Sequence, residues 1–367
     1  MAGRSLDIAG AGMAGLCAAA RARELRLAPV VYEKGARPGG SMLLSSCVVW
    51  RYRTLDDFRA ECPGGDPRLQ QLVIERFDDA LAWIESLGAP VVWEETGNPR
   101  TIGKRFDPEG LTDVLLRAAG DVRLETAVPQ PDGPLLLATG GFQGDPDLVR
   151  RHITTEPLLH RANRWSTGDG LRLGLERGGS LSTGMNEFYG RAMPAPPAEI
   201  PESRFVELAQ LYGTYALVLN EAGEEFAPHP VSWAETDLVQ AIARQPGGRA
   251  WYAVDEPTLE IEIRGRTVLD MIDDAREAGG TVLTAGELGF ELPDSYRYAV
   301  HVAAGITYTV GGLRVDERAR VLDDAGNAIE GLLSAGVDAG GIAAGGYASG
   351  LATALVLGLT AAETAAV

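Results

Sequence analysis

The sequence predicts an α/β fold, in which apolar strands that lead into glycine turns alternate with helices and are interrupted by a long segment without such turns. Short apolar runs that lead into glycine turns stand at residues 6–9, 135–137 and 332–338, as expected for strands of one parallel sheet. Residues 186–300 lack such turns and hold most of the Pro-rich and aromatic segments. At 367 residues, the chain is long enough for two domains.

The first 33 residues predict a strand–helix–strand unit. Leu6–Ala9 is a short apolar run, Met13–Leu27 has the composition of a helix, and Val30–Tyr32 forms the next strand, which ends at Glu33. The turn between the first strand and the helix has the spacing G-x-G-x-x-G, formed by Gly10, Gly12 and Gly15. This motif in this context is typical of dinucleotide binding.

Each part of this unit has a physical reason. Gly10 permits the tight turn, Gly12 lets the backbone approach a pyrophosphate, and Gly15 permits close helix–strand packing. The helix N-terminus supplies N–H groups and a partial positive charge. Glu33 is placed to bind a ribose 2′-OH, which argues against a 2′-phosphorylated nucleotide. The alternative is a glycine turn that only packs a helix.

The residues after Glu33 narrow the nucleotide to FAD. Lys34 follows, and then a second glycine turn, Gly39-Gly40-Ser41. A second turn so soon after the ribose carboxylate suits a chain that wraps a long, bent dinucleotide.

Four later segments resemble the succinate dehydrogenase/fumarate reductase flavoprotein family, which includes 3-ketosteroid dehydrogenases. These segments are ATGGFQGDPDLV at 138–149, STGDGLRLGLERGGSL at 166–181, ITYTVGGLRVD at 306–316, and the C-terminal segment from Leu332 with its glycine pairs. The resemblance implies a Rossmann-like FAD-binding domain, residues 1–185 and 301–367, with an inserted α+β cap domain, residues 186–300.

The resemblance also implies which residues bind FAD. They are Gly10, Ala11, Gly12, Met13, Ala14, Gly15, Glu33, Lys34, Gly39, Gly40, Ser41, Met42, Ser45, Ser46, Val128, Thr139, Gly140, Asp169, Asp338, Ser349, Gly350 and Leu351. We expect FAD to be held non-covalently, because no histidine of the family type follows Gly39-Gly40. A cysteinyl bond at Cys47 is the alternative.

The chain departs from the family where charged substrates are bound. No arginine follows the segment Asn220–Phe226, Tyr308 stands where the family has a histidine, and Tyr347 stands where it has a carboxylate-binding arginine. A buried carboxylate needs paired donors, so these losses argue against succinate or fumarate. Residues 122–134 are also shorter than the β-meander segment of the family, which should expose more of the adenine side.

Aromatic residues replace the lost cations. Tyr347 stands three residues before Gly350, and this Tyr-x-x-Gly pattern resembles that of the ketosteroid dehydrogenases, in which the tyrosine polarises a substrate carbonyl. The remaining catalytic candidates are Tyr308, Tyr189 and His229, the last in the segment where the family carries its proton donor. Each has a simpler interpretation: Tyr347 and Tyr308 as pocket walls, and Tyr189 and His229 as structural or surface residues.

The sequence therefore predicts an FAD-dependent oxidoreductase that desaturates, or in reverse reduces, the bond next to a carbonyl of a mostly uncharged small molecule. Hydride would pass to or from flavin N5. One alternative is an oxidase or aromatising enzyme that reoxidises its flavin with O₂. Another is a protein that binds flavin without redox turnover. The expected electron partner is an external acceptor or O₂, since no second nucleotide fingerprint is present.

Composition excludes several partners. A net charge of −18 argues against nucleic acid and against an anionic membrane surface. The apolar stretch from Leu351 is interrupted by Thr360 and Glu363, so we expect a buried helix there and no membrane span. Three cysteines without metal spacing and no apparent targeting segment favour the reducing cytoplasm and no metal site.

Overall fold

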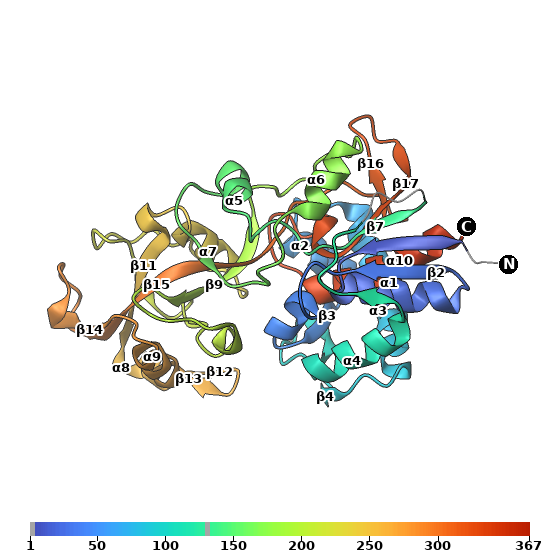
Figure 1. Cartoon of the computed structure of the whole chain (residues 1–367). Helices are drawn as coiled ribbons and strands as arrows, with labels where there is room; N and C mark the ends of the chain where they lie inside the picture. The colour runs from blue at the N-terminus through green and yellow to red at the C-terminus, as the bar shows by residue number, and fades with distance from the viewer. Residues whose placement is uncertain (1–3, 129–132) are drawn as a thin grey trace. The chain divides into compact units, whose positions relative to one another are not determined.

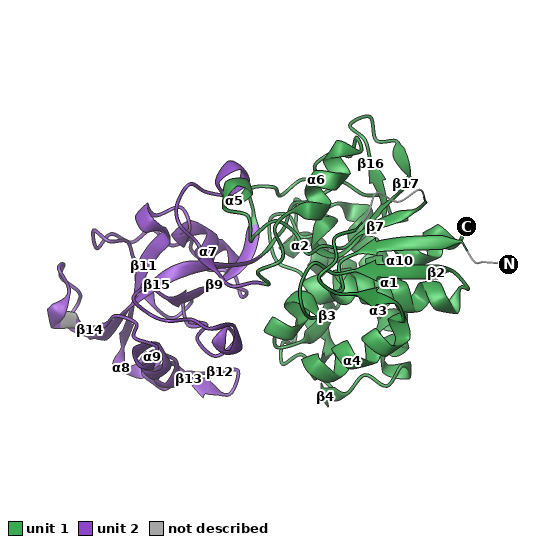
Figure 2. Ribbon diagram, in the orientation of Figure 1, with its two compact units in different colours: residues 1–148, 163–187, 308–367 green, residues 149–162, 188–307 purple. Residues whose placement is uncertain are grey.

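The computed structural model describes residues 4–128 and 133–367. The chain divides into two compact units: unit 1 comprises residues 1–148, 163–187 and 308–367, and unit 2 comprises residues 149–162 and 188–307 (Figure 2). The predicted division placed 149–162 in the first domain, whereas the structure groups this segment with unit 2. The reason is packing, because Val149, Ile153 and Leu158 join the hydrophobic core of unit 2.

Unit 1 holds most of the helices. Its elements are β1 Ser5–Ala9, α1 Met13–Glu24, β2 Ala28–Tyr32, η1 Gly40–Leu44, β3 Val48–Tyr52, α2 Leu55–Glu61, α3 Pro67–Ser86, β4 Val91–Trp93, β5 Thr101–Phe106, α4 Pro108–Ala119, β6 Val122–Arg123, β7 Leu135–Leu137, α6 Asp169–Glu176, β16 Arg320–Leu322, β17 Ala328–Ser334, η5 Gly336–Asp338 and α10 Gly350–Ala366. The helix α5, Pro146–His152, crosses the boundary between the units.

The main sheet of unit 1 has the strand order β16-β17-β7-β1-β2-β6. All its pairs are parallel except β16 with β17. Ala9 pairs with Tyr32 and with Leu137, and Leu137 pairs with Ser334, so four strands end at the same edge. The predicted ligand-binding turns at Gly10, Glu33 and Thr139 follow these strand ends, as is usual in open parallel sheets.

The first and last helices pack together on this sheet (Figure 1). Gly358 of α10 makes the approach close, since a Cβ there would lie 2.5 Å from the Ala14 carbonyl oxygen of α1. Eleven of the seventeen residues of α10 are buried, as predicted from its Ala/Leu composition.

One predicted strand ends early. The apolar run Leu332–Asp338 was expected to be a strand throughout, but β17 ends at Ser334 and residues Gly336–Asp338 form a 3-10 turn. Gly336 has a φ of +66°, a left-handed conformation that breaks an extended strand. The turn matters for the site, because it places Asp338 within hydrogen-bond distance of the glycine turn that follows β7.

Unit 2 is built on an antiparallel sheet. Its strands follow the order β10-β11-β15-β14, and β8 and β9 also pair with β15. The elements are β8 Leu159–His160, β9 Phe188–Pro194, η2 Glu202–Arg204, β10 Leu217–Leu219, α7 Thr236–Ile242, η3 Pro246–Gly248, β11 Arg249–Asp255, α8 Glu256–Leu259, β12 Glu262–Ile263, β13 Arg266–Thr267, α9 Val268–Glu277, β14 Val282–Thr284, η4 Ala285–Glu287 and β15 Tyr296–Thr309.

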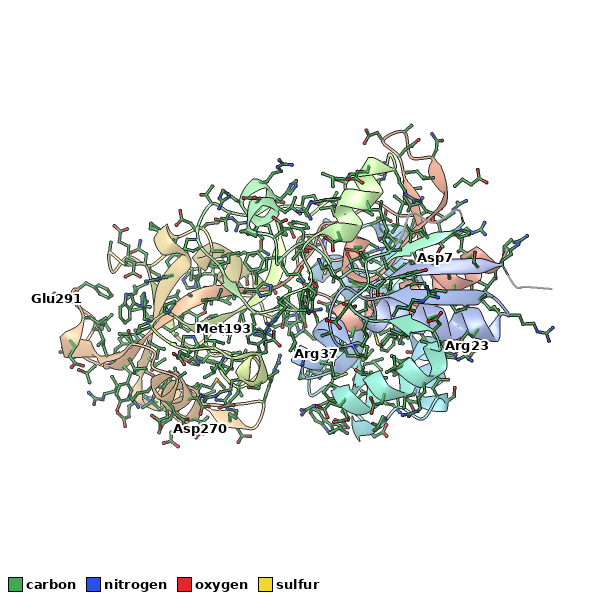
Figure 3. The ribbon with its side chains drawn as sticks, viewed as in Figure 1. Asp7, Arg23, Arg37, Met193, Asp270 and Glu291 are labelled. Carbon is green, nitrogen blue, oxygen red and sulfur yellow. The ribbon has the colours of Figure 1, made fainter. Side chains whose placement is uncertain are left out.

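The core of unit 2 lies between this sheet and its helices. Tyr252 and Val300 of the sheet and Leu238 and Met271 of the helices are fully buried there. Met193 of β9 is also buried, in a smaller cluster, whereas Asp270 caps the first turn of α9 at the surface (Figure 3).

Within the described ranges, none of the helices is both long and apolar enough to cross a membrane. The same ranges contain no cluster of three or more His, Cys, Asp or Glu side chains that could hold a metal ion.

Candidate functional site

The turn after β1 leaves room for a ligand at one of its three glycines. A side chain at Gly10, whose φ is +107°, would overlap the Ala138 carbonyl, and a side chain at Gly15 would overlap the Gly10 carbonyl. At Gly12, by contrast, a Cβ would meet no atom within 4 Å. The fold requires Gly10 and Gly15, whereas Gly12 keeps an open position at the N-terminus of α1, where Met13 and Ala14 begin the helix. This open position fits a pyrophosphate.

Glu33 is tied to the same turn. It is buried at the carboxyl end of β2, where its Oε2 accepts a hydrogen bond from the Ala11 N–H at 2.8 Å and its Oε1 accepts one from the Gly35 N–H at 2.6 Å. Each carboxylate oxygen has a further lone pair. The group is therefore fixed by the backbone and can still accept a hydrogen bond from a ribose hydroxyl.

The second glycine turn lies against the first. The Gly39 N–H donates to the Ala11 carbonyl at 2.7 Å, and Gly39 has a φ of +101°. A Cβ at Gly40 would lie 3.4 Å from Gly12 Cα. The short helix η1 then carries the next predicted ligands, and the Ser45 hydroxyl closes it by donating to the Met42 carbonyl at 2.9 Å. The remaining predicted residues of this segment are Ser41 and Ser46.

Lys34 and Asp169, which are distant in sequence, meet at the rim of this region. Lys34 Nζ donates to Asp169 Oδ2 at 2.5 Å and to Thr167 Oγ1 at 2.6 Å. Trp165 lies next to them and was missed by the sequence analysis. A Cβ at Gly35 would lie 2.6 Å from Trp165 Cδ1, so the half-exposed indole stands directly on the turn that holds Glu33.

Asp338 organises the glycine turn after β7. Its carboxylate is almost fully buried and accepts hydrogen bonds from the Thr139 N–H at 2.5 Å, the Thr139 hydroxyl at 3.1 Å and the Gly141 N–H at 3.0 Å. Gly140, between these donors, has a φ of +92°. Burial raises the pKa of Asp338, although the three donors favour its charged form. The structure thus joins the Thr139–Gly140 turn to η5.

The remaining residues predicted to contact the cofactor are Val128 and, for the alternative of a covalent bond, Cys47. Val128 is half-buried after β6, and the residues that follow it, 129–132, lie outside the described ranges. Cys47 is fully buried, and burial raises the pKa of its thiol to about 12. Since the thiolate is the nucleophile, this environment disfavours a cysteinyl bond.

The loop before α10 brings two of the predicted tyrosines together. The Tyr308 hydroxyl donates to the Ala348 carbonyl at 2.6 Å, next to Tyr347. The Tyr347 ring lies 5.4 Å from the Trp50 ring, centroid to centroid, and the Tyr52 hydroxyl donates to the Tyr347 carbonyl at 2.5 Å. Ser349 then caps the helix, because its Oγ accepts a bond from the Ala352 N–H at 3.2 Å, and Gly350 and Leu351 follow in the first turn.

The other two catalytic candidates belong to unit 2. Tyr189 is half-buried on β9, with the Arg191 guanidinium carbon 5.3 Å from its ring centroid. His229 is 69% exposed, and its Nε2 lies 2.8 Å from Glu225 Oε1. Arg191 is a buried cation that the sequence analysis did not consider. It forms part of a buried pair with Glu235, at 3.9 Å.

Sequence reasoning also missed Trp50 and Tyr52. Both lie on β3, an element without any motif, and they reach the 347–349 loop only through the tertiary fold. The alternation of aromatic residues in Trp50-Arg51-Tyr52 was the available signal, because alternate residues of a strand share one face.

Comparison with known families gives two matches. The FAD binding domain family matches residues 130–352, more than half of the chain, and a family described as an NAD(P)-binding Rossmann-like domain matches residues 8–56. The second match covers the β1–α1–β2 unit and the turns that follow it.

Comparison with individual proteins gives relatives along the whole chain. A probable fumarate reductase, Ifc3 of Shewanella frigidimarina, is 24% identical over 98% of this chain and 74% of its own length. A vinyl phenol reductase of Lactiplantibacillus plantarum is 34% identical, but over 26% of this chain and 20% of its own. The structure of a 3-ketosteroid Δ1-dehydrogenase from Sterolibacterium denitrificans has the same fold, with a TM-score of 0.72 at 15% identity over the full length of both chains.

Proposed function

The chain belongs to the FAD binding domain family, and on that premise we propose its substrate class and the roles of its tyrosines. It is an FAD-dependent oxidoreductase of the fumarate reductase/ketosteroid dehydrogenase type, which acts on CH–CH or C=C bonds. The residues present fit FAD, since the position beside Gly12 is open and the Glu33 carboxylate is bonded to the Ala11 N–H of the same turn. We propose that FAD is held without a covalent bond.

The proposed substrate is a mostly uncharged carbonyl compound. The names of the two relatives indicate substrates that range from the dianion fumarate to a neutral vinyl phenol. The observation that carries the proposal is the aromatic character of the 347–349 loop, where Tyr347 packs against Trp50. The resemblance in sequence implies that this tyrosine replaces a carboxylate-binding arginine. A phenol can donate one hydrogen bond to a neutral carbonyl but cannot neutralise two carboxylates.

In the proposed mechanism, the Tyr347 phenol donates to the substrate carbonyl oxygen. This oxygen gains negative charge when the adjacent carbon loses a proton, and a fixed donor stabilises it in that state. The flavin, when bound, would supply the acceptor for a hydride from the neighbouring carbon, or the hydride donor in the reverse reaction. The proton is taken up or supplied by a residue of this chain, for which Tyr308, Tyr189 and His229 are the candidates.

Two further assignments complete the proposal. We propose that the reduced flavin is reoxidised by an external acceptor or O₂, which measurement of H₂O₂ release would distinguish. We also propose a cytoplasmic location, because Cys17, Cys47 and Cys62 are buried as free thiols, the usual state in a reducing compartment.

The experiment compares substrates anaerobically on the reduced holoenzyme. An uncharged cyclic enone should restore the absorbance of oxidised flavin, whereas fumarate at millimolar concentration should not. Robust fumarate reduction would overturn the proposed substrate class. With an active enone, Tyr347→Phe should lower turnover by about 10²–10³-fold, as expected for one lost donor, with normal FAD content. Wild-type turnover in this variant would exclude Tyr347 as the carbonyl donor.

A further inference from the structure

The loop before α10 is held by side chains from three separate parts of unit 1. Tyr52 of β3 donates to the Tyr347 carbonyl at 2.5 Å, and Tyr308, near the end of β15, donates to the Ala348 carbonyl at 2.6 Å. On the other side of the loop, Glu187 Oε2 accepts a bond from the Gly345 N–H at 2.6 Å. Two consecutive carbonyls of the loop are thus each bonded to a phenol.

Holding two consecutive carbonyls fixes more than the two oxygens. A peptide unit is planar, and its N–H points opposite to its C=O. The bond to the Tyr347 carbonyl therefore sets the direction of the Ala348 N–H, and the bond to the Ala348 carbonyl sets that of the Ser349 N–H. The same bonds fix the Cα from which the Tyr347 side chain departs.

The environment keeps the Tyr52 phenol in the donor state. Tyr52 is fully buried, and burial raises the pKa of its hydroxyl, so that it stays protonated. Its ring lies edge-on to Trp50, at 5.3 Å, and Trp50 in turn contacts the Tyr347 ring. The strand β3 therefore supports Tyr347 at both its backbone and its ring.

We infer that Tyr52 and Tyr308 are positioning residues that hold the 347–349 loop, so that the Tyr347 phenol is preorganised for the substrate carbonyl. The inference rests on the proposed function for the role of Tyr347. It also assigns different roles to Tyr308 and Tyr347. Because the Tyr308 hydroxyl donates its proton to the Ala348 carbonyl, Tyr308 acts through Tyr347 and is not the proton relay.

A double-mutant cycle in the holoenzyme tests this coupling. Tyr308→Phe removes one hydrogen bond to the loop and should lower kcat by roughly tenfold with KM within about twofold, because orientation affects the transition state most. Adding Tyr308→Phe to Tyr347→Phe should change kcat by less than about threefold, since the positioned group is already absent. Effects that multiply in the double variant would show that Tyr308 acts independently and would overturn the inference.

Amide hydrogen exchange tests the loop without reference to turnover. Tyr52→Phe and Tyr308→Phe should each speed exchange across residues 345–352 by roughly tenfold. The matched control is Tyr212→Phe in unit 2, which also loses a buried hydrogen bond, to Gln210 Oε1 at 2.9 Å, and should leave that exchange and kcat unchanged. Unchanged exchange in both loop variants would overturn the inference. Faster exchange in an enzyme that turns over no enone would contradict only the proposed function.

Discussion

The two units bury carboxylates in different ways. In unit 1, Asp338 has both oxygens bonded to the Thr139–Gly141 turn, through two N–H groups and a hydroxyl. In unit 2, Glu235 is also buried, and its Oε1 accepts a bond from the Thr214 N–H at 3.2 Å. Among the residues that the structure describes, its Oε2 has no hydrogen-bond partner, and it faces the Arg191 guanidinium at 3.9 Å.

The two arrangements correspond to two roles of a buried carboxylate: ordering a backbone turn and compensating a buried cation. The unit 1 carboxylates, Glu33 and Asp338, shape backbone turns that follow strand ends, where a ligand binds in a parallel sheet. Glu235 lies inside a core, where it faces a buried cation and accepts a hydrogen bond from the Thr214 N–H. Binding of the cofactor should therefore be sensitive to changes in unit 1, whereas pH-dependent stability should be sensitive to changes at Glu235.

The largest effect should come from Gly12→Val. The side chain would occupy the open position where the pyrophosphate is proposed to lie, so we expect a folded protein that retains no FAD. Gly15→Val is the contrasting variant, because its Cβ would overlap the Gly10 carbonyl and should prevent folding. Circular dichroism and flavin absorbance of the purified proteins separate these outcomes. Full FAD occupancy in Gly12→Val would refute the assignment of the phosphate site.

Asp338→Asn should have the next largest effect. An amide group cannot accept hydrogen bonds with both of its atoms, so at least one N–H of the turn would face an NH₂ group. We expect a loss of roughly 1–3 kcal/mol in the free energy of unfolding, together with weaker FAD retention. Urea unfolding and FAD titration measure the two quantities. A stable variant with normal FAD affinity would mean that this carboxylate does not organise the turn.

Glu235 should make stability depend on pH. Burial raises its pKa above the ordinary value of 4.5, so the folded protein binds this proton more tightly than the unfolded chain does. The resulting stabilisation is fully present below pH 4.5 and is lost as the pH rises through the raised pKa. Glu235→Gln removes the titrating group, so above pH 4.5 its free energy of unfolding should fall less steeply with pH than that of the wild type, as measured by thermal melting. Identical slopes would contradict this account.

The smallest effect should come from His229→Ala. The side chain is exposed and its pair with Glu225 is a surface contact, so the free energy of unfolding should change by less than about 0.5 kcal/mol. A loss of turnover in this variant would therefore report on chemistry rather than on folding. Normal turnover would remove His229 from the proton-transfer candidates and leave Tyr189.

Features set by neighbouring residues could be predicted from the sequence, whereas contacts between distant segments could not. The β1–α1–β2 unit was predicted correctly because its strand, turn and helix signals are local, and Glu33 follows directly from its place after β2. The prediction that this strand extends to Asp338 was wrong, because Gly336 takes a left-handed conformation inside an apolar run. Tyr52 was not found, because its partner, the Tyr347 carbonyl, lies 295 residues away and no motif marks the pair.

The packing of α1 against α10 has a consequence for biosynthesis. Gly358 lies against Ala14, and Arg4 Nη1 donates to the Val367 carbonyl at 3.0 Å, so the first helix of the nucleotide-binding unit is completed by a helix made more than 300 residues later. During translation, the face of α1 that packs on α10 stays uncovered until α10 has left the ribosome. We therefore expect FAD capture to follow the emergence of α10, and a nascent chain without α10 to expose this apolar face to chaperones.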